Sequence, residues 1–440
     1  MDSHTTHRLH QALLLLLALA LGSLVVVEPA RAAPPSGDPV RALARAAQPL
    51  SDLRPLERMI GSAKIVGVGE ATHSSREFFR IKHRVFQDLV ERKGFTTFAL
   101  EANWSTGLRL NDYVLHGKGE PERIMREEFQ NSYLIWNTRE YLDLIRWMRE
   151  HNVRHPHHPV QFMGDDAAYA GPELFDEVTG HVAERYPALL PEFRRLYKAS
   201  RPTASVDETI KAYMFRPLDE RRTMAADVQR ALKLLEQQPP GPDLGRHAWI
   251  VQHARAIAQV GTMYSYDFAD PAGLGRMMLY RDRIMAENTV WWQRQTGHRM
   301  LLSAHNGHVG YETSNPAQYP KLQGAFIRDM IGTAYASVGF TFGQGSFNAL
   351  DLTDPAEPIR EFSVGPPEPG SNEQTLERVS RRDYYLDLRT APAAAQEWLS
   401  VVRRTRNIGN AWPVETEPVR LAPSYDVLVH LHRIHAADRL

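Results

Sequence analysis

The sequence predicts an α/β protein, in which a mostly parallel sheet is flanked by helices and a large all-helical insertion forms a lid or subdomain. An apolar run at residues 65–68, an amphipathic segment at 74–93 and a second apolar run at 96–100 follow one another as strand, helix and strand. Further strand-like runs occur later in the chain. Between them, about 120 residues have helical periodicity and no strand signal.

The composition is that of a globular protein of more than one structural part. Its 440 residues exceed a typical single core, which suggests one large domain with an elaboration or two domains. Lysine plus arginine equals aspartate plus glutamate, at 52 each, so no excess of positive charge favours nucleic acid as a partner. The chain has no cysteine, which excludes disulfides, thiol nucleophiles and thiolate metal ligands.

The first 32 residues have the pattern of a secretory signal peptide. His7 and Arg8 precede an apolar run of about 16 residues, and an Ala-x-Ala site follows at residues 30–32. A transmembrane anchor is the alternative, but the run is shorter than the ~20 residues that a span needs. We therefore expect a secreted or periplasmic protein with no stable membrane anchor after cleavage. Residues 33–50 are predicted to be a linker that enters a helix.

The first part of the α/β core is predicted at residues 51–170. A short helix precedes the first strand, and the helix at 74–93 stops at Gly94. Another helix is expected to start at Asn137 or Thr138, either of which can cap it. An apolar run at 160–164 then ends in glycine and acid, and is a further candidate strand.

The helical insertion is predicted at residues 171–297 and the second part of the core at 298–440. The second part is expected to contain one further helix, at 393–403. Its predicted strands lie at residues 299–304, 334–342, 384–388 and 425–429.

Polar side chains follow three of the predicted strands. Glu70 and His73 follow the first, Glu101 ends the second, and His305 and His308 follow the strand at 299–304. Taken singly, such a residue is more often structural, for example an acid at a helix N-terminus. Because parallel strands deliver their carboxyl ends to one edge of a sheet, the set of five predicts a site there.

These residues belong to an ordered set of motifs that resembles the erythromycin esterase family. The resemblance runs from about residue 60 to about residue 345 and is weaker in the C-terminal strand region. The matching pieces are Gly69-Glu70-Ala71-Thr72-His73, Phe98-Ala99-Leu100-Glu101-Ala102, Trp136-Asn137-Thr138, Gly164-Asp165-Asp166, Arg281-Asp282, Met285-Ala286-Glu287-Asn288 and Ala304-His305-Asn306-Gly307-His308.

The resemblance implies an α/β core with a helical insertion and hydrolysis of an ester, a macrolide lactone, by activated water. Carried over onto matching positions, His73 is the general base, Glu70 and Glu101 are its acidic partners, and His305 and His308 form a second histidine pair. The residues alone agree with this chemistry, since the chain has no Gly-x-Ser-x-Gly elbow for a serine nucleophile. A neutral imidazole can instead take a proton from water.

Two alternatives stay open. The same three imidazoles and two carboxylates suit zinc or manganese, so the protein is alternatively a metal-dependent hydrolase, although the resemblance favours action without a cofactor. The second alternative is an exported binding or polysaccharide-assembly protein that kept the fold without turnover. All five polar residues are present, which favours an enzyme with a small-molecule ester or macrolactone as substrate.

Overall fold

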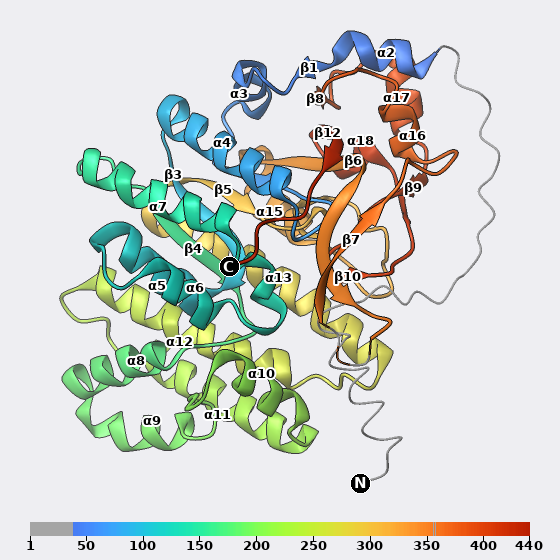
Figure 1. Cartoon of the computed structure of the whole chain (residues 1–440). Helices are drawn as coiled ribbons and strands as arrows, with labels where there is room; N and C mark the ends of the chain where they lie inside the picture. Colours follow the sequence, from blue (N-terminus) through green and yellow to red (C-terminus); the bar gives the residue numbers. More distant parts are fainter. Residues whose placement is uncertain (1–37, 355, 357) are drawn as a thin grey trace.

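Figure 1 shows the computed structural model, which describes residues 38–440 except 355 and 357. Its central sheet has the strand order β1-β8-β12-β6-β2-β5-β3-β4. Neighbouring strands are parallel from β12 to β4, whereas β8 and β1 add antiparallel at the other edge. The predicted α/β class with a mostly parallel sheet is confirmed. The strands of this path are β1 (Gln48–Pro49), β2 (Ile65–Val68), β3 (Phe95–Asn103), β4 (Gln161–Asp166), β5 (Arg299–Ser303), β6 (Tyr335–Asp351), β8 (Tyr384–Asp387) and β12 (Val427–Ile434).

The strand order brings three strand ends together. β2 and β3 are consecutive and joined by α4 (Arg76–Lys93), but β5 lies between them in the sheet. Ser303, the last residue of β5, pairs with Val68 on one side and with Leu100 on the other. The carboxyl ends of β2, β5 and β3 are therefore level at one edge of the sheet, where such folds bind their ligands.

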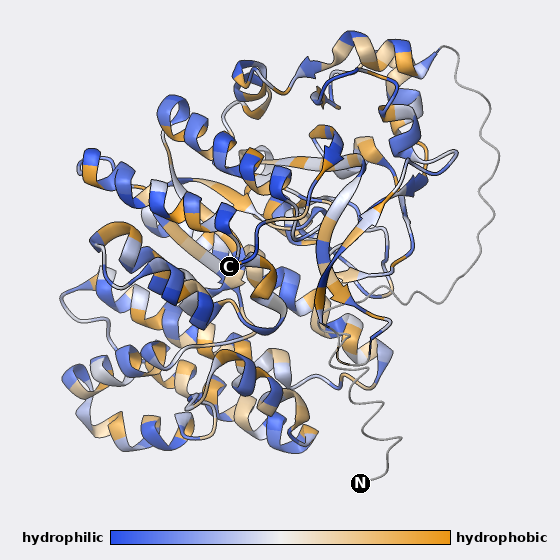
Figure 2. Ribbon diagram, viewed as in Figure 1, coloured by the Kyte–Doolittle hydropathy of each residue, from blue (hydrophilic) through white to orange (hydrophobic). Residues whose placement is uncertain are grey.

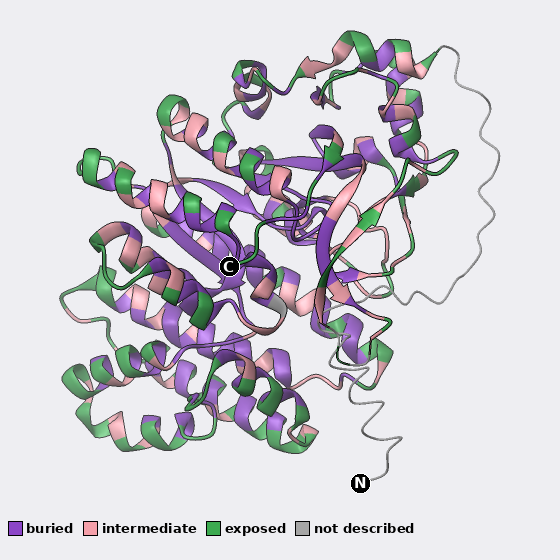
Figure 3. Cartoon of the chain, viewed as in Figure 1, coloured by how far each residue is buried: buried purple, intermediate pink, exposed green. Residues whose placement is uncertain are grey.

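Helices cover both faces of the sheet, because successive strand side chains point to opposite faces. On one face, Val66 and Phe98 pack with α4 and α7 (Arg139–Arg154). On the other face, Ile65 and Ala99 pack with the helices that connect β4 to β5. The strands between the two helical layers are apolar in Figure 2 and buried in Figure 3.

The segment between β4 and β5 is entirely helical and forms the lower layer in Figure 1. Its apolar side chains belong to the same buried cluster as one face of the sheet, so this layer is fixed to the sheet by hydrophobic burial. Its last helix lies directly against β4. The elements are α8 (Pro172–Arg185), η2 (Pro187–Leu189), α9 (Leu190–Tyr197), α10 (Val206–Phe215), α11 (Leu218–Glu236), α12 (Leu244–Tyr264) and α13 (Pro271–Thr296).

Most predicted element boundaries agree with the structure, and the exceptions lie in the C-terminal part. The predicted start of α7 is confirmed, since the Thr138 side chain accepts a hydrogen bond from the backbone nitrogen of Tyr141. The strand predicted at 334–342 continues to Asp351, where it pairs antiparallel with β7 (Ile359–Val364). β7 was not predicted, because its six residues do not alternate regularly between polar and apolar and none of them is fully buried.

The strand predicted at 425–429 runs on as β12 to Ile434, through His430, His432 and Arg433. Polar side chains end an apolar run in the sequence, yet His430 is fully buried here. The helix predicted at 393–403 ends at Leu399. The remaining elements are α2 (Pro39–Ala46), α3 (Arg54–Ile60), α5 (Trp104–His116), α6 (Pro121–Glu128), η1 (Asn131–Trp136), α14 (Asn306–Val309), α15 (Gln323–Ile331), η3 (Gly332–Ala334), α16 (Asn372–Leu376), α17 (Ala393–Leu399), β9 (Arg403–Thr405), β10 (Ala411–Trp412), β11 (Glu417–Val419) and α18 (Leu421–Ser424).

The predicted signal peptide, residues 1–32, lies outside the described residues. Of the segment predicted to be a linker, the described part contains α2, which packs against α17. Across residues 38–440, apart from 355 and 357, no helix has both the length and the apolar character that a membrane span requires.

Candidate active site

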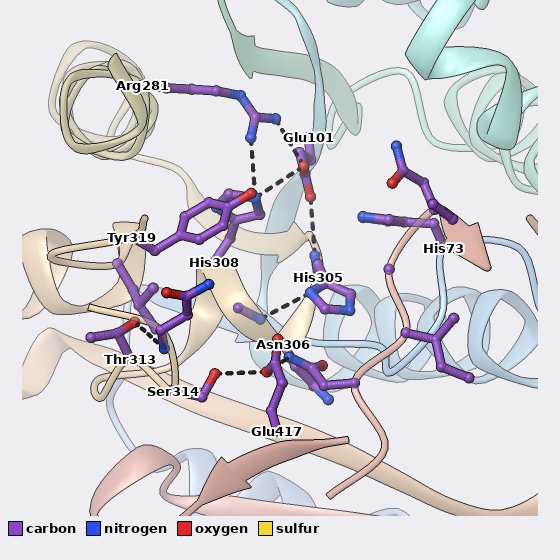
Figure 4. Close-up of a pocket in the computed structure, with 18 of the residues that line it drawn as sticks. His73, Glu101, Arg281, His305, Asn306, His308, Thr313, Ser314, Tyr319 and Glu417 are labelled. Carbon is purple, nitrogen blue, oxygen red and sulfur yellow. Dashed lines mark hydrogen bonds and ion pairs between the residues drawn. The ribbon is translucent and has the colours of Figure 1, made fainter. Parts of the chain in front are cut away.

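The five predicted residues meet at the edge where β2, β5 and β3 end. Glu70 and His73 follow β2, Glu101 lies in β3, and His305 and His308 lie at α14, directly after β5. All five are buried, with at most 9% of each residue exposed. Four of them line a cavity of about 700 Å³, and Glu70 lies behind His73. Figure 4 shows His73 on one side of this cavity, with Glu101, His305 and His308 opposite it.

His73 is held by a chain of buried polar groups. Its Nδ1 lies 2.9 Å from Oε1 of Glu70, whose other oxygen bonds to the Lys82 ammonium. Lys82 also donates to Oγ of Ser303, at 3.0 Å. Because a carboxylate only accepts hydrogen bonds, this geometry assigns the His73 proton to Nδ1. In the neutral ring, the Nε2 lone pair of His73 then remains available to the cavity that His73 lines.

His305 has the opposite arrangement. It is the N-cap of α14, and its Nδ1 accepts a hydrogen bond from the backbone nitrogen of Gly307, at 3.2 Å. Burial lowers the pKa of His305 well below its usual value, so its ring is neutral. The proton therefore lies on Nε2, which is buried and has no partner among the described residues. The His73 and His305 ring centroids are 4.8 Å apart.

His308 is a cation rather than a free donor. Its Nδ1 lies 2.8 Å from Asp282 and its Nε2 lies 3.2 Å from Glu101, so both ring nitrogens face carboxylates. Burial alone would lower the pKa of His308, but these two carboxylates outweigh it and raise the pKa to about 10. Arg281 also lies 3.2 Å from Nε2 of His308, so a carboxylate and a guanidinium meet at that nitrogen.

Glu101 connects the histidines to a buried arginine. One carboxylate oxygen accepts from the backbone nitrogen of His305, at 3.1 Å, and the other accepts from Arg281, at 2.9 Å. Burial would raise the pKa of Glu101, but His308 and the charge of Arg281 hold it well below its usual value. The family resemblance made Glu101 a partner of His73. In the described residues its hydrogen bonds go to the opposite wall of the cavity instead.

Arg281 is fixed in turn by Asp166 at the end of β4. The guanidinium donates to both carboxylate oxygens of Asp166, with an Nη2–Oδ2 distance of 2.6 Å, and Tyr133 donates to the same oxygen. Bidentate pairs of this kind are geometrically specific. Since Arg281 and Asp282 both come from α13, the helical layer contributes to the site directly.

The remaining cavity wall combines apolar and polar groups. The Trp136 ring meets His73 edge-on, with centroids 5.1 Å apart, and its Nε1 donates to the carbonyl of Glu101. α10 and α12 contribute Met214 and Met263. Away from the histidines, Glu417 accepts hydrogen bonds from Ser314 and Asn407, and burial raises its pKa. The cavity thus offers an apolar surface with polar groups at two places, as ligand sites commonly do.

The histidines do not present three free nitrogens to a metal ion. Both nitrogens of His308 face carboxylates, and one nitrogen of His73 and one of His305 are engaged. Two Nε2 atoms remain. A three-histidine metal site of the predicted kind would therefore require an ion to take the place of a His308 proton that faces Asp282 or Glu101.

Sequence reasoning missed Lys82 and did not assign a role to Arg281 or Asp282. Lys82 lies four residues from both Phe78 and Phe86, on the apolar face of α4, and is 1% exposed. A lysine on the apolar face of a helix could have indicated a buried ion pair, since lysine is almost never fully buried without a partner. Arg281 and Asp282 belong to the quoted motifs, but their partners lie on other elements.

The chain is similar to known proteins over most of its length. The model of the erythromycin esterase family matches residues 90–434, a range that starts after Glu70 and His73. Erythromycin esterase type II from Escherichia coli is 22% identical over 80% of this chain and 87% of its own length. A putative hydrolase of Bacillus subtilis, YbfO, is 21% identical over 89% of this chain and 90% of its own.

Solved structures share the fold over 91% of this chain and 98% of theirs. A succinoglycan biosynthesis protein has a TM-score of 0.79 at 26% identity. A Bacillus cereus protein has a TM-score of 0.81 at 27% identity. An erythromycin esterase mutant in its open conformation has a TM-score of 0.68 at 18% identity. Since the family model covers most of the sequence, the chain belongs to the erythromycin esterase family.

Proposed function

We propose that the protein is an exported hydrolase that cleaves an ester, such as a macrolactone, with water activated by His73. The observation that carries this proposal is a pair of buried imidazoles whose Nδ1 atoms have opposite partners, a carboxylate for His73 and a backbone N–H for His305. In the neutral forms that the proposal requires, Nε2 of His73 is unprotonated, and Nε2 of His305 is protonated and has no partner among the described residues. When water attacks a carbonyl, a base must remove a proton from the water and a hydrogen-bond donor must stabilise the carbonyl oxygen. His73 and His305 lie next to each other and can take these two roles.

In the proposed reaction, Nε2 of His73 takes a proton from water as the water oxygen attacks the ester carbonyl. Glu70 stabilises the imidazolium that forms, and Lys82 holds Glu70 in place. The Nε2–H of His305 donates to the carbonyl oxygen as it becomes negative. The tetrahedral intermediate then expels the alkoxide, which takes the proton from His73. The products are one carboxylic acid and one alcohol, and His73 is neutral again.

The cavity favours a substrate of appreciable size. Its volume of about 700 Å³ lies within the range of pockets for drug-sized ligands. The apolar surface from Met214 and Met263 suits the hydrocarbon part of a macrolactone, and the Glu417 group suits its hydroxyls. Mass spectrometry of a macrolide panel incubated with the mature protein tests the proposal. We expect one compound to gain the mass of one water, whereas His73→Ala protein leaves it intact.

A second candidate is a role in polysaccharide assembly without turnover, which the similarity to a succinoglycan biosynthesis protein favours. Acylated oligosaccharides belong in the same panel for this reason. Binding of an oligosaccharide with no hydrolysis of any ester would support this role and contradict the first proposal.

Export is part of the proposal and rests on the N-terminal sequence pattern. N-terminal sequencing of protein recovered outside the cytoplasm should begin near Ala33. An intact Met1 in a membrane fraction would contradict export.

A further inference from the structure

A second cluster of metal-ligating side chains lies apart from the cavity, between β12 and the end of α16. β12 places His430 and His432 two residues apart, so both project from the same face of the strand. Glu377 directly follows α16. In the described part of the chain, these three residues alone bring three imidazole or carboxylate ligand atoms within 4.8 Å of one another. None of them lines the cavity.

His430 is fully buried and faces a carboxylate. Its Nε2 lies 3.0 Å from Oε1 of Glu377, and its Nδ1 lies 2.9 Å from the hydroxyl of Thr341 on the adjacent strand β6. That hydroxyl is also within 3.5 Å of the carbonyl of Val429, which only accepts. Thr341 thus orients Nδ1 of His430, and Nε2 faces the Glu377 carboxylate, where a bound cation would take the place of the Nε2 proton.

His432 repeats this arrangement. Its Nε2 lies 2.9 Å from the carbonyl of Ser380, so that nitrogen carries a proton. Its Nδ1 lies 3.2 Å from Oδ1 of Asp383, an oxygen that already accepts from the backbone nitrogen of His432. Each histidine therefore has one nitrogen fixed by a neutral oxygen and the other aimed at a carboxylate. Metal-ligating histidines are typically oriented in this way by a second hydrogen bond.

The fold leaves space for the Glu377 carboxylate. A Cβ atom at Gly343 on β6 would lie 1.9 Å from Oε1 of Glu377, so a larger residue there would displace the carboxylate from its present position. Among the ion pairs of the described residues, Glu377 is joined to His430 and to no lysine or arginine. The nearby Arg406 donates to backbone carbonyls, including those of Gly365 and Pro366. The Glu377 carboxylate is thus in direct contact with an imidazole, while Arg406 directs its hydrogen bonds to backbone carbonyls.

We propose that Glu377, His430 and His432 bind a divalent metal ion, with Asp383 beside them and Thr341 as a positioning residue. Two imidazoles and a carboxylate are ligands that zinc prefers. The site lies between β12, β6 and α16, where a bound ion joins the antiparallel edge of the sheet to its neighbouring helix. It is independent of the proposed hydrolysis, because no residue of the cluster touches the cavity.

Calorimetry tests this site. The full-length protein is treated with a chelator and titrated with zinc ions, and its melting temperature is measured with and without zinc. We expect one zinc ion per chain and a higher melting temperature with zinc than without it. Glu377→Gln and His432→Gln should each abolish the tight binding and the thermal shift. Thr341→Val, which removes only the hydroxyl that orients His430, should weaken binding by ~10–100-fold. Both ligand variants alter partly exposed side chains, and circular dichroism verifies that they fold.

His157→Ala is the control, because His157 is exposed in a histidine-rich loop that provides an alternative place for zinc. It should bind zinc as the wild type does. The proposal is overturned if the wild type binds no zinc, or if both ligand variants bind it unchanged. Loss of the tight binding in His157→Ala would place the ion in the loop and would equally overturn the proposal.

Discussion

Replacing Lys82 by methionine removes the cation that holds Glu70 behind the proposed catalytic histidine. The Lys82 and Glu70 side chains are 1% and 0% exposed, so Lys82→Met leaves a carboxylate buried without its counter-ion. Breaking a buried ion pair from one side typically costs ~3–5 kcal/mol of folding free energy. Lys82 also loses its hydrogen bonds to Ser303 and to the carbonyl of Ala304. We therefore expect a loss near the upper end of that range.

Urea denaturation followed by circular dichroism measures this loss. Lys211→Met is the matched control, because Lys211 forms an ion pair with Asp207 that is largely exposed to solvent, and such pairs contribute only ~0–1 kcal/mol. The double variant Lys82→Met/Glu70→Gln should recover part of the loss, since it removes the unpaired charge. A loss in Lys82→Met no greater than in Lys211→Met, or strictly additive effects, would refute the reasoning.

The other predictions concern the histidines opposite His73 and the role of metal. The folded-state pKa of His308, about 10, exceeds its unfolded value of ~6.5, so its contribution to stability is complete below the lower value and is lost as pH rises through the higher one. His308→Gln should therefore flatten the alkaline fall in urea-denaturation stability, and parallel curves would contradict this charge assignment. His305→Ala should lower kcat by ~10²–10³, the effect of losing one oxyanion donor, whereas a wild-type kcat would remove His305 from the mechanism. Dialysis against a chelator should leave ester hydrolysis intact, even where it removes zinc from the Glu377 cluster. If activity is lost instead, and zinc restores it in both the wild type and Glu377→Gln, a metal ion acts at the histidines of the cavity.

The sequence was sufficient to predict which strand ends bring the five polar side chains together. Residues 65–73 and 299–308 each combine an apolar run with glycine and polar groups. Such a local pattern is enough to locate a strand and the polar residues that follow it. The position of β5 between β2 and β3 was not predictable from these patterns, since strand order depends on packing between distant segments. Because of that order, the ring centroids of His305 and His73 lie 4.8 Å apart.

The protonation states were also beyond the sequence. His308 is a cation because Asp282 comes from α13 and Glu101 from β3, elements about 180 residues apart in the chain. The same distance separates Arg281 from Glu101. Sequence motifs identify such residues as a set, whereas their partners become known only when the helical layer is placed against the sheet.

The kcat of His73→Ala, on an ester that the mass-spectrometric panel identifies, tests the central claim most directly. Because His73 is proposed to remove the proton from water, kcat should fall by ~10²–10⁴ while KM changes little and circular dichroism reports an intact fold. His157→Ala, in the exposed loop, should keep the wild-type kcat. Equal losses in the two variants, or a wild-type kcat in His73→Ala, would contradict the assignment of His73 as the base.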